Sequence, residues 1–78
     1  MREFRRLTMP TKAHPLVKRM FEEMARQQIG VLDLAERAGV NPNTLRDWRT
    51  RTMPTIDNLE ACLNVLGLEM AARTRRDT

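Results

Sequence analysis

The sequence has little of what disulfide bonds, metal sites and acid–base catalysis require. Its 78 residues include one cysteine, Cys62, one histidine, His14, and three glycines. A single cysteine excludes an internal disulfide framework and a cysteine-based zinc site, and is typical of a reducing compartment. A lone histidine with no paired acid, together with the lack of a glycine-rich phosphate loop, provides neither a nucleophile–base pair nor a metal cluster. We therefore expect a protein that is not an enzyme and that holds no cofactor or metal.

Long apolar runs are also absent. No run approaches the roughly 20 residues that a membrane-spanning helix needs, and the basic N-terminus lacks the apolar stretch that follows in a signal peptide. A peptide lying on a membrane surface is a poor interpretation, because the apolar helix faces are needed for a core. The sequence therefore predicts a cytoplasmic protein.

Aromatic residues are scarce, at 4% with one Trp and no Tyr, while hydrophobic residues reach 41%. The core must therefore consist of Leu, Val, Ile, Met and Ala, which suits helices packed on helices. The six methionines, apart from the initiator, are interpreted as core filler. A chain of 78 residues allows one small domain at most, so we expect a single all-α domain.

Positive charge is in excess. The chain has 14 Lys and Arg against 10 Asp and Glu, a formal net charge of +4 and a pI near 10.6. A basic small domain indicates a polyanionic partner, either nucleic acid or an anionic membrane surface. Solubility would explain the same charge, so charge alone does not choose between these interpretations.

Hydrophobic spacing predicts the first two of four helices. Residues 15–28 carry an apolar arc opposite a charged one, and His14 before them is interpreted as a capping or solvent residue. A second, short helix over 31–38 ends at Gly39, which can adopt the left-handed conformation that follows many helices. The apolar arcs contain Leu16, Val17, Met20, Phe21 and Met24 in the first helix, and Leu34, Ala35 and Ala38 in the second.

Capping residues predict the other two helices. Asn41 is a good N-cap and Pro42 a good first residue for a third helix that fades near residues 50–52. Thr55 caps a fourth helix over 56–66. The inward-facing residues are Leu45 and Trp48 on the third helix, and Ile56, Leu59, Cys62, Leu63 and Leu66 on the fourth.

The two ends of the chain differ from the helical region. The predicted divisions are a basic N-terminal arm, 1–13, a helix-turn-helix domain, 14–67, and a C-terminal segment, 68–78. The arm is expected to be flexible or a short strand, with Arg2, Arg5 and Arg6 either in a minor groove or in solvent. Residues 68–73 alternate loosely between apolar and polar and predict either a short strand or a helical continuation.

The stretch 31–49 is the most informative part of the sequence. It contains a short helix, a Gly39 turn and a second, capped helix, and such a turn lets two helices cross steeply. With Leu45 and Trp48 turned inward, the opposite side of the predicted third helix must be exposed. A helix fits the major groove of DNA, where Asn pairs with adenine, Arg with guanine, and Thr with several bases. At 100° per residue, that outward side holds Asn43, Arg46, Asp47 and Thr50.

Residues 20–66 resemble the lambda-repressor/Cro-type (XRE) helix-turn-helix family. The resemblance covers all four predicted helices and rests on Leu34-Ala35, Gly39-Val40, Leu45-x-x-Trp48, Pro54, and Leu59 through Leu66-Gly67. It implies a helical bundle whose third helix enters the major groove, while the second directs its N-terminus at a phosphate. It also implies a bacterial or phage transcriptional regulator that binds double-stranded DNA.

The same resemblance implies two sets of DNA contacts. The base-reading set is Asn43, Thr44, Arg46 and Asp47. The phosphate set is Gly30, Val31, Asn41, Arg49, Thr50, Arg51 and Thr52. Family members usually bind as homodimers on half-sites about 34 Å apart. The segment 67–73 is the best dimerisation candidate here, with Leu68 and Met70 as apolar anchors.

Three positions depart from the family pattern. Gly30 and Val31 stand where the second helix often begins with Ser or Thr followed by Gln, so only backbone N–H groups can serve a phosphate there. Arg49 replaces a frequent Glu, and Arg51 a frequent Gly. Both changes add positive charge beside the third helix, which is the helix expected to read bases. This charge favours phosphate contact by the residues after that helix over a merely polar turn.

Two alternative functions stay open. An antitoxin of a toxin–antitoxin pair would bind DNA and a toxin. A protein-interaction adaptor would keep the fold but bind RNA polymerase or a repressor. Asp47, which repels phosphate, and the altered start of the second helix at Gly30 and Val31 give this alternative some weight. Asp47 can also accept a hydrogen bond from cytosine or orient Arg51 one turn later. Selection from random DNA separates the adaptor from a regulator, because an adaptor would enrich no motif.

Overall fold

Four helices and no strand form within the part of the chain that the computed structural model describes, residues 7–10, 12–72 and 74. They are α1 (Pro15–Gln27), α2 (Val31–Ala38), α3 (Pro42–Asp47) and α4 (Ile56–Val65). The prediction of an all-α domain with four helices is confirmed. The third helix is shorter than a fade near residue 50 suggests, because turns replace it after Asp47.

The helix ends follow the capping chemistry of the sequence. His14 Nδ1 accepts from the N–H of Leu16 at 3.0 Å, Asn41 from that of Asn43 at 2.8 Å, and Thr55 from that of Asn58 at 3.3 Å. Gly39 ends α2 with φ of 74°, a left-handed conformation that glycine adopts without strain. α1 ends instead on a non-glycine residue, Gln28, whose φ is 58°.

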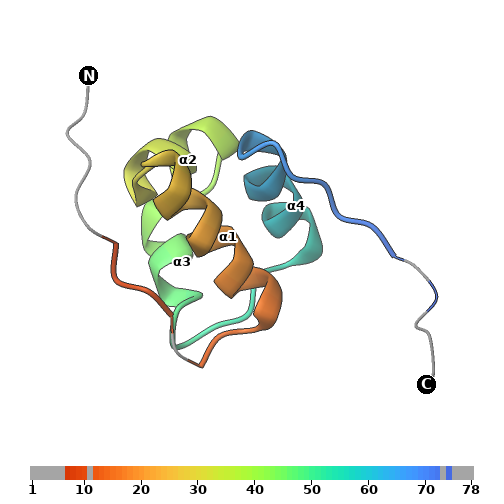
Figure 1. Cartoon of the computed structure of the whole chain (residues 1–78). Helices are drawn as coiled ribbons and strands as arrows, with labels where there is room; N and C mark the ends of the chain where they lie inside the picture. The colour runs from red at the N-terminus through yellow and green to blue at the C-terminus, as the bar shows by residue number, and fades with distance from the viewer. Residues whose placement is uncertain (1–6, 11, 73, 75–78) are drawn as a thin grey trace.

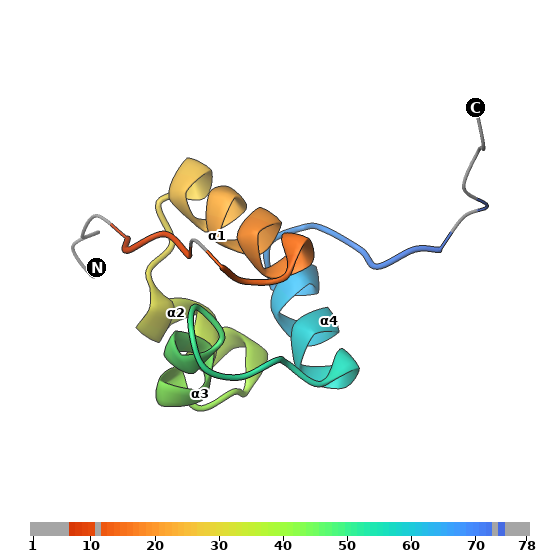
Figure 2. The same cartoon turned by 90° about the horizontal axis from the view of Figure 1, so that it is seen from below.

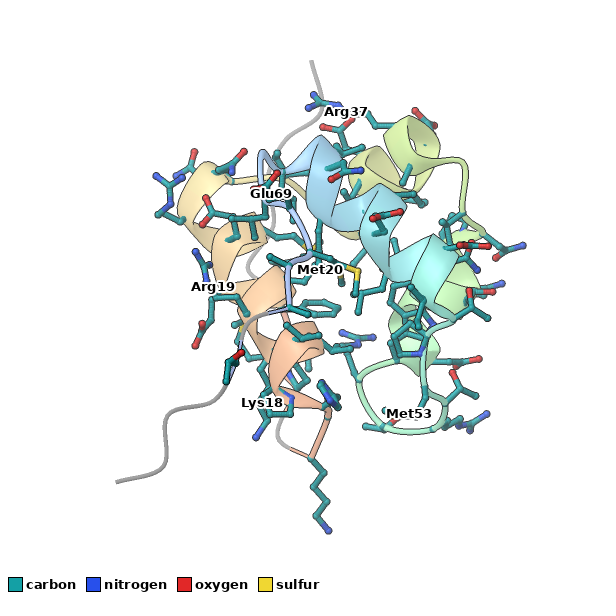
Figure 3. The ribbon with its side chains drawn as sticks, turned by 90° about the vertical axis from the view of Figure 1, so that its right-hand side faces the viewer. Lys18, Arg19, Met20, Arg37, Met53 and Glu69 are labelled. Carbon is teal, nitrogen blue, oxygen red and sulfur yellow. The ribbon has the colours of Figure 1, made fainter. Side chains whose placement is uncertain are left out.

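The core lies where the four helices meet. α2 packs against both α3 and α4, and α1 packs against α4. Figure 1 shows this arrangement, and Figure 2 shows α1 and α3 on opposite sides of the bundle. Figure 3 shows Met20 pointing from α1 toward α4. The largest fully buried side chains come from every helix: Phe21, Met20, Met24 and Val17 from α1, Leu34 from α2, Leu45 from α3, and Cys62 from α4.

Several apolar residues that the sequence predicts to lie in the core are exposed instead. Leu16 is 40% exposed and Ile56 is 72% exposed. Both lie in the first turn of their helices and at the edge of the apolar arc, and burial of such edge positions is incomplete. Among the methionines interpreted as filler, Met9 and Met53 lie outside helices and are also exposed, while Met70 is half-buried.

The C-terminal segment is neither the strand nor the helical continuation predicted from its alternation, over the described residues 68–72. Gly67, with φ of 81°, turns the chain out of α4, and the Leu68 N–H closes the turn on the carbonyl of Leu63 at 2.8 Å. The segment leaves the bundle where α1 and α4 meet (Figure 3). Leu68 and Met70 are half-buried and pack against the core of their own chain.

The N-terminal arm also packs where the structure describes it. Leu7 packs against the core and Pro10 is buried, without a strand in residues 7–10. Arg2, Arg5 and Arg6 lie outside the described residues. None of the helices in the described part of the chain has the length and apolar character that crossing a bilayer demands.

Candidate nucleic-acid interface

The α2–α3 pair is set by a tight turn. Gly39 provides the left-handed residue, and the N–H of Val40 donates to the carbonyl of Ala35 at 3.0 Å. Ala35 is 1% exposed, so its small side chain fits within the packed interior. The two helices pack against each other directly. A turn closed by hydrogen bonds and covered by packing fixes the angle between them.

α3 has one buried side and one free side. Leu45 is fully buried and Trp48, directly after the helix, is 3% exposed, as predicted. Asn43 and Arg46 are exposed on the other side, and Thr44 and Asp47 are half-buried. The predicted orientation of this helix is therefore confirmed. Base contact by these four residues stays a prediction.

The two exposed members of the base-reading set are joined to each other. Arg46 Nη1 donates to Asn43 Oδ1 at 3.0 Å, one helical turn apart. The link leaves the amide N–H groups of Asn43 and the other guanidinium N–H groups of Arg46 as donors toward a ligand. The pair thus forms one polar unit that points into solvent from α3.

The turn after α3 brings three members of the phosphate set together. The carbonyl of Asp47 accepts from the N–H of Thr50 at 3.1 Å, of Arg51 at 2.7 Å and of Thr52 at 3.1 Å. The side chains of these three residues are all exposed. Their backbone is thus fixed internally, while one guanidinium and two hydroxyls stay available to a ligand.

Arg49 differs from Arg51 although both belong to the phosphate set. It is half-buried, its Nε donates to the carbonyl of Arg46 at 3.2 Å, and its Nη1 donates to the carbonyl of Thr8 at 3.4 Å. Two of its five N–H donors are therefore directed at the protein's own backbone. No local sequence pattern predicts the second contact, because Thr8 is 41 positions away.

The other members of the phosphate set lie at helix starts. Gly30 is the extended N-cap of α2 and provides no side-chain cap. Gly30 and Val31 are half-buried, while Asn41, the N-cap of α3, is exposed. The first N–H groups of a helix have no intrahelical partner and attract anions. The start of α2 therefore offers backbone N–H groups and no capping side chain.

A buried carboxylate forms a cluster that sequence reasoning missed. Glu23 in α1 is 3% exposed and accepts from Arg19 at 3.0 Å, from Arg26, and from Gln27 at 2.7 Å. Hydrogen bonds from Arg26, then from Gln27 and Arg19, lower the pKa of Glu23 from its ordinary 4.5 to about 2, although burial opposes the shift. The i+3 and i+4 spacing of its partners was the signal available in the sequence.

The Glu23 cluster also joins two helices. Gln27 Nε2 donates to Glu23 and, at 2.7 Å, to the carbonyl of Leu66 at the end of α4. A carbonyl at a helix C-terminus lacks an intrahelical donor, so the bond satisfies it. The cluster therefore fixes α1 against α4 at the point where the C-terminal segment begins.

The buried thiol of Cys62 offers no separate chemistry. Burial raises the pKa of the Cys62 thiol to about 11, which keeps it a neutral thiol near pH 7. Among residues 7–10, 12–72 and 74, no group of three or more His, Cys, Asp and Glu residues could hold a metal ion.

Comparison with known proteins is consistent with this geometry. A family model described as helix-turn-helix, of the lambda-repressor (XRE) type, matches residues 18–72. The match runs from the first turn of α1 through α4 into the C-terminal segment. The family is one of DNA-binding regulators and is typically non-enzymatic. No curated protein and no solved structure matches the chain.

Proposed function

Because the chain belongs to the lambda-repressor-type (XRE) helix-turn-helix family, we propose that it is a sequence-specific transcriptional regulator of a bacterium or a phage. It reads the major groove of double-stranded DNA with α3, in the cytoplasm at the host's nucleoid. The base-reading set and the phosphate set defined above, apart from Arg49, supply its contacts.

One observation carries this proposal: α3 is buried on one side and polar and exposed on the other. Leu45 and Trp48 are held in the core, while Asn43 and Arg46 face outward as a hydrogen-bonded pair. An Arg that forks onto guanine and an Asn that pairs with adenine are common major-groove contacts. The exposed pair therefore supplies the donors and acceptors that base edges recognise.

The phosphate contacts flank this pair. Thr50, Arg51 and Thr52 lie on the turn after α3, and the N-termini of α2 and α3 contribute backbone N–H groups at Gly30 and Val31 and the Asn41 side chain. Phosphate contacts set the position and orientation of a protein on the duplex but carry no sequence information. They would hold α3 in register while its outward residues read bases.

Selection from a random DNA pool tests the central claim. We expect the full chain to enrich a short motif, with specific binding stronger than random binding by at least about a thousandfold. Enrichment of no motif would reject sequence-specific regulation and favour a protein-interaction adaptor instead.

Arg46→Ala tests base reading at one residue. We expect a loss of about 1–3 kcal/mol and a relaxed preference at one base pair of the selected motif. Lys18→Ala is the control, because it removes the same charge from α1, where Figure 3 shows the Lys18 side chain pointing away from the bundle. Equal weakening on selected and random DNA would contradict a base-reading role for Arg46.

A homodimer joined through residues 67–73 is the second part of the proposal. The half-burial of Leu68 and Met70 supports it in part, because some of each side chain stays available to a second copy. Sedimentation of the full chain and of a chain that ends at Gly67 tests this. We expect a dimer of the full chain to be lost on truncation, and an undiminished dimer would refute the role of the segment.

A further inference from the structure

We propose that Arg49 is a positioning residue that ties the N-terminal segment 7–10 to the end of α3 and so holds the base-reading side of α3 in place, rather than a phosphate contact. The inference rests on the proposed function and deepens it. It concerns a position where the family frequently has Glu and this chain has Arg.

The first observation is where the Arg49 guanidinium lies. Its Nε donates to the carbonyl of Arg46 at 3.2 Å, which is the backbone of a base-reading residue. The backbone N–H of Arg49 donates to the same carbonyl, also at 3.2 Å. A positive group at a helix C-terminus is favourable both as a hydrogen-bond donor and through the helix dipole. Arg49 thus closes the end of the helix that carries the base readers.

The second observation is what Arg49 contacts at its other end. Its Nη1 donates to the carbonyl of Thr8, and this contact lies between two anchored residues. Leu7 packs against the hydrophobic core, and Pro10 is buried. The hydrogen bond to Thr8 thus links residues 7–10, drawn in red in Figure 1, to the turn that follows α3. The segment therefore provides a fixed acceptor, and Arg49 connects it to the end of the reading helix.

The length of α3 explains why such a connection matters. A helix of six residues has few internal hydrogen bonds and does not persist by itself. Its placement depends on Leu45, Trp48 and whatever holds its ends. Asn41 fixes the start of α3, and Arg49 is the residue whose side chain fixes the end. A small displacement there would move Arg46 relative to a base edge, where bidentate contact demands exact placement.

The test asks whether the charge of Arg49 or the hydrogen-bonding geometry of its guanidinium matters for DNA binding. Arg49→Lys keeps the charge but replaces the planar fork by a single ammonium, and Arg49→Gln removes the charge. Binding of the full chain to its selected site and to random DNA is measured over a range of salt concentrations. For both variants we expect specific binding relative to random binding to fall roughly five- to tenfold, the effect of one hydrogen bond, with the salt slope unchanged.

Arg51 is the matched control, because it is exposed and its side chain stands in the phosphate set. Arg51→Gln should weaken binding to both DNAs and reduce the salt slope by about one unit. If Arg49→Gln behaves in the same way, with an unchanged preference for the selected site, Arg49 is a phosphate contact and the proposal is overturned.

Leu7→Ala tests the connection without changing any charge. If Arg49 acts by holding segment 7–10, the losses from Leu7→Ala and Arg49→Lys will overlap, so that the double variant loses less than the product of the two. Independent losses that multiply would show that Arg49 does not act through the segment.

Trp48 gives a readout that needs no DNA. It is the single Trp of the chain, is 3% exposed and precedes Arg49 directly. Loosening of the end of α3 should raise the quenching of its fluorescence by acrylamide in Arg49→Lys but not in Arg51→Lys. If random DNA yields no motif, the proposed function fails while this measurement still decides the role of Arg49. Unchanged quenching would then overturn it.

Discussion

α1 and α3 are held in the molecule by different means. α1 has 13 residues and buries Val17, Met20, Phe21 and Met24 along its length, together with the carboxylate of Glu23. α3 has six residues and buries Leu45 alone, with Trp48 buried just beyond its end. Burial of apolar surface dominates the placement of a helix like α1. A helix like α3 depends on fewer contacts, and these are concentrated at its ends.

The difference shows how a small domain can present a rigid helix to a ligand. Burying more of α3 would place it more firmly but would cover the side that faces outward. The chain instead fixes α3 through one apolar side, an N-cap at Asn41 and the hydrogen bonds of Arg49. α1 and α4 supply the core that this arrangement needs. The polar outward side of α3 is therefore compatible with a defined position.

The largest expected effect concerns the apolar side of α3. Trp48→Ala should lower the free energy of unfolding by about 3–5 kcal/mol, as much as Phe21→Ala in α1, because each removes a large buried ring. Met53→Ala is the control, because Met53 is 66% exposed and its loss should stay within about 0.5 kcal/mol. Thermal or urea unfolding measures all three. A small loss for Trp48→Ala would show that the apolar side does not hold α3.

A smaller effect separates the two helix starts. Asn41→Ala and Thr55→Ala each remove an N-cap and should lower the free energy of unfolding by about 1 kcal/mol. The loss should be smaller for Thr55→Ala, because the hydrogen bond that Thr55 accepts is 3.3 Å long and that of Asn41 is 2.8 Å. Only Asn41→Ala should also weaken binding to selected DNA, since it loosens the reading helix. If Asn41→Ala and Thr55→Ala weakened DNA binding equally, the start of α3 would have no special role in binding.

How much of this structure the sequence predicts depends on how far apart in the sequence the contacting residues lie. The four helices, the caps at Asn41 and Thr55 and the left-handed Gly39 follow from residues within a few positions of one another. The orientation of α3 also follows, because Leu45 and Trp48 define its inward side. Periodicity does not tell how wide a strip a neighbouring helix covers. For this reason the spacing predicts Ile56, at the edge of its arc, to lie in the core, whereas its side chain is 72% exposed.

The candidate site was predictable only in part for the same reason. Exposure of Asn43 and Arg46 follows from helical geometry. The contact of Arg49 with Thr8 spans 41 positions, and that of Gln27 with Leu66 spans 39. Neither spacing leaves a local pattern. The conformation of residues 68–72 was equally hidden, because an alternating segment becomes a strand only where a partner strand exists.

The last prediction concerns α1 and the dependence of its stability on pH. The pKa of Glu23 is lowered from 4.5 to about 2 in the folded chain. Its ionised form therefore contributes stability that is complete above pH 4.5 and is lost as the pH falls from there toward 2. We expect the unfolding temperature to decline over this interval, and to decline less in Glu23→Gln. Asp57→Asn, in the exposed first turn of α4, is the control. An equal acid decline in native and Glu23→Gln chains would exclude the Glu23 cluster as its cause.

The amide of Gln27 has a consequence at the level of a single atom. Its nitrogen serves two acceptors, the Glu23 carboxylate and the Leu66 carbonyl. Glutamate has nearly the same shape but carries no proton at neutral pH, so three oxygen atoms would face one another where two hydrogen bonds now stand. Conversion of this one amide to an acid would turn the attraction between two helices into repulsion. The contact between α1 and α4 therefore requires an amide nitrogen at position 27. The hydrophobic pattern of the sequence shows only that a polar residue stands there.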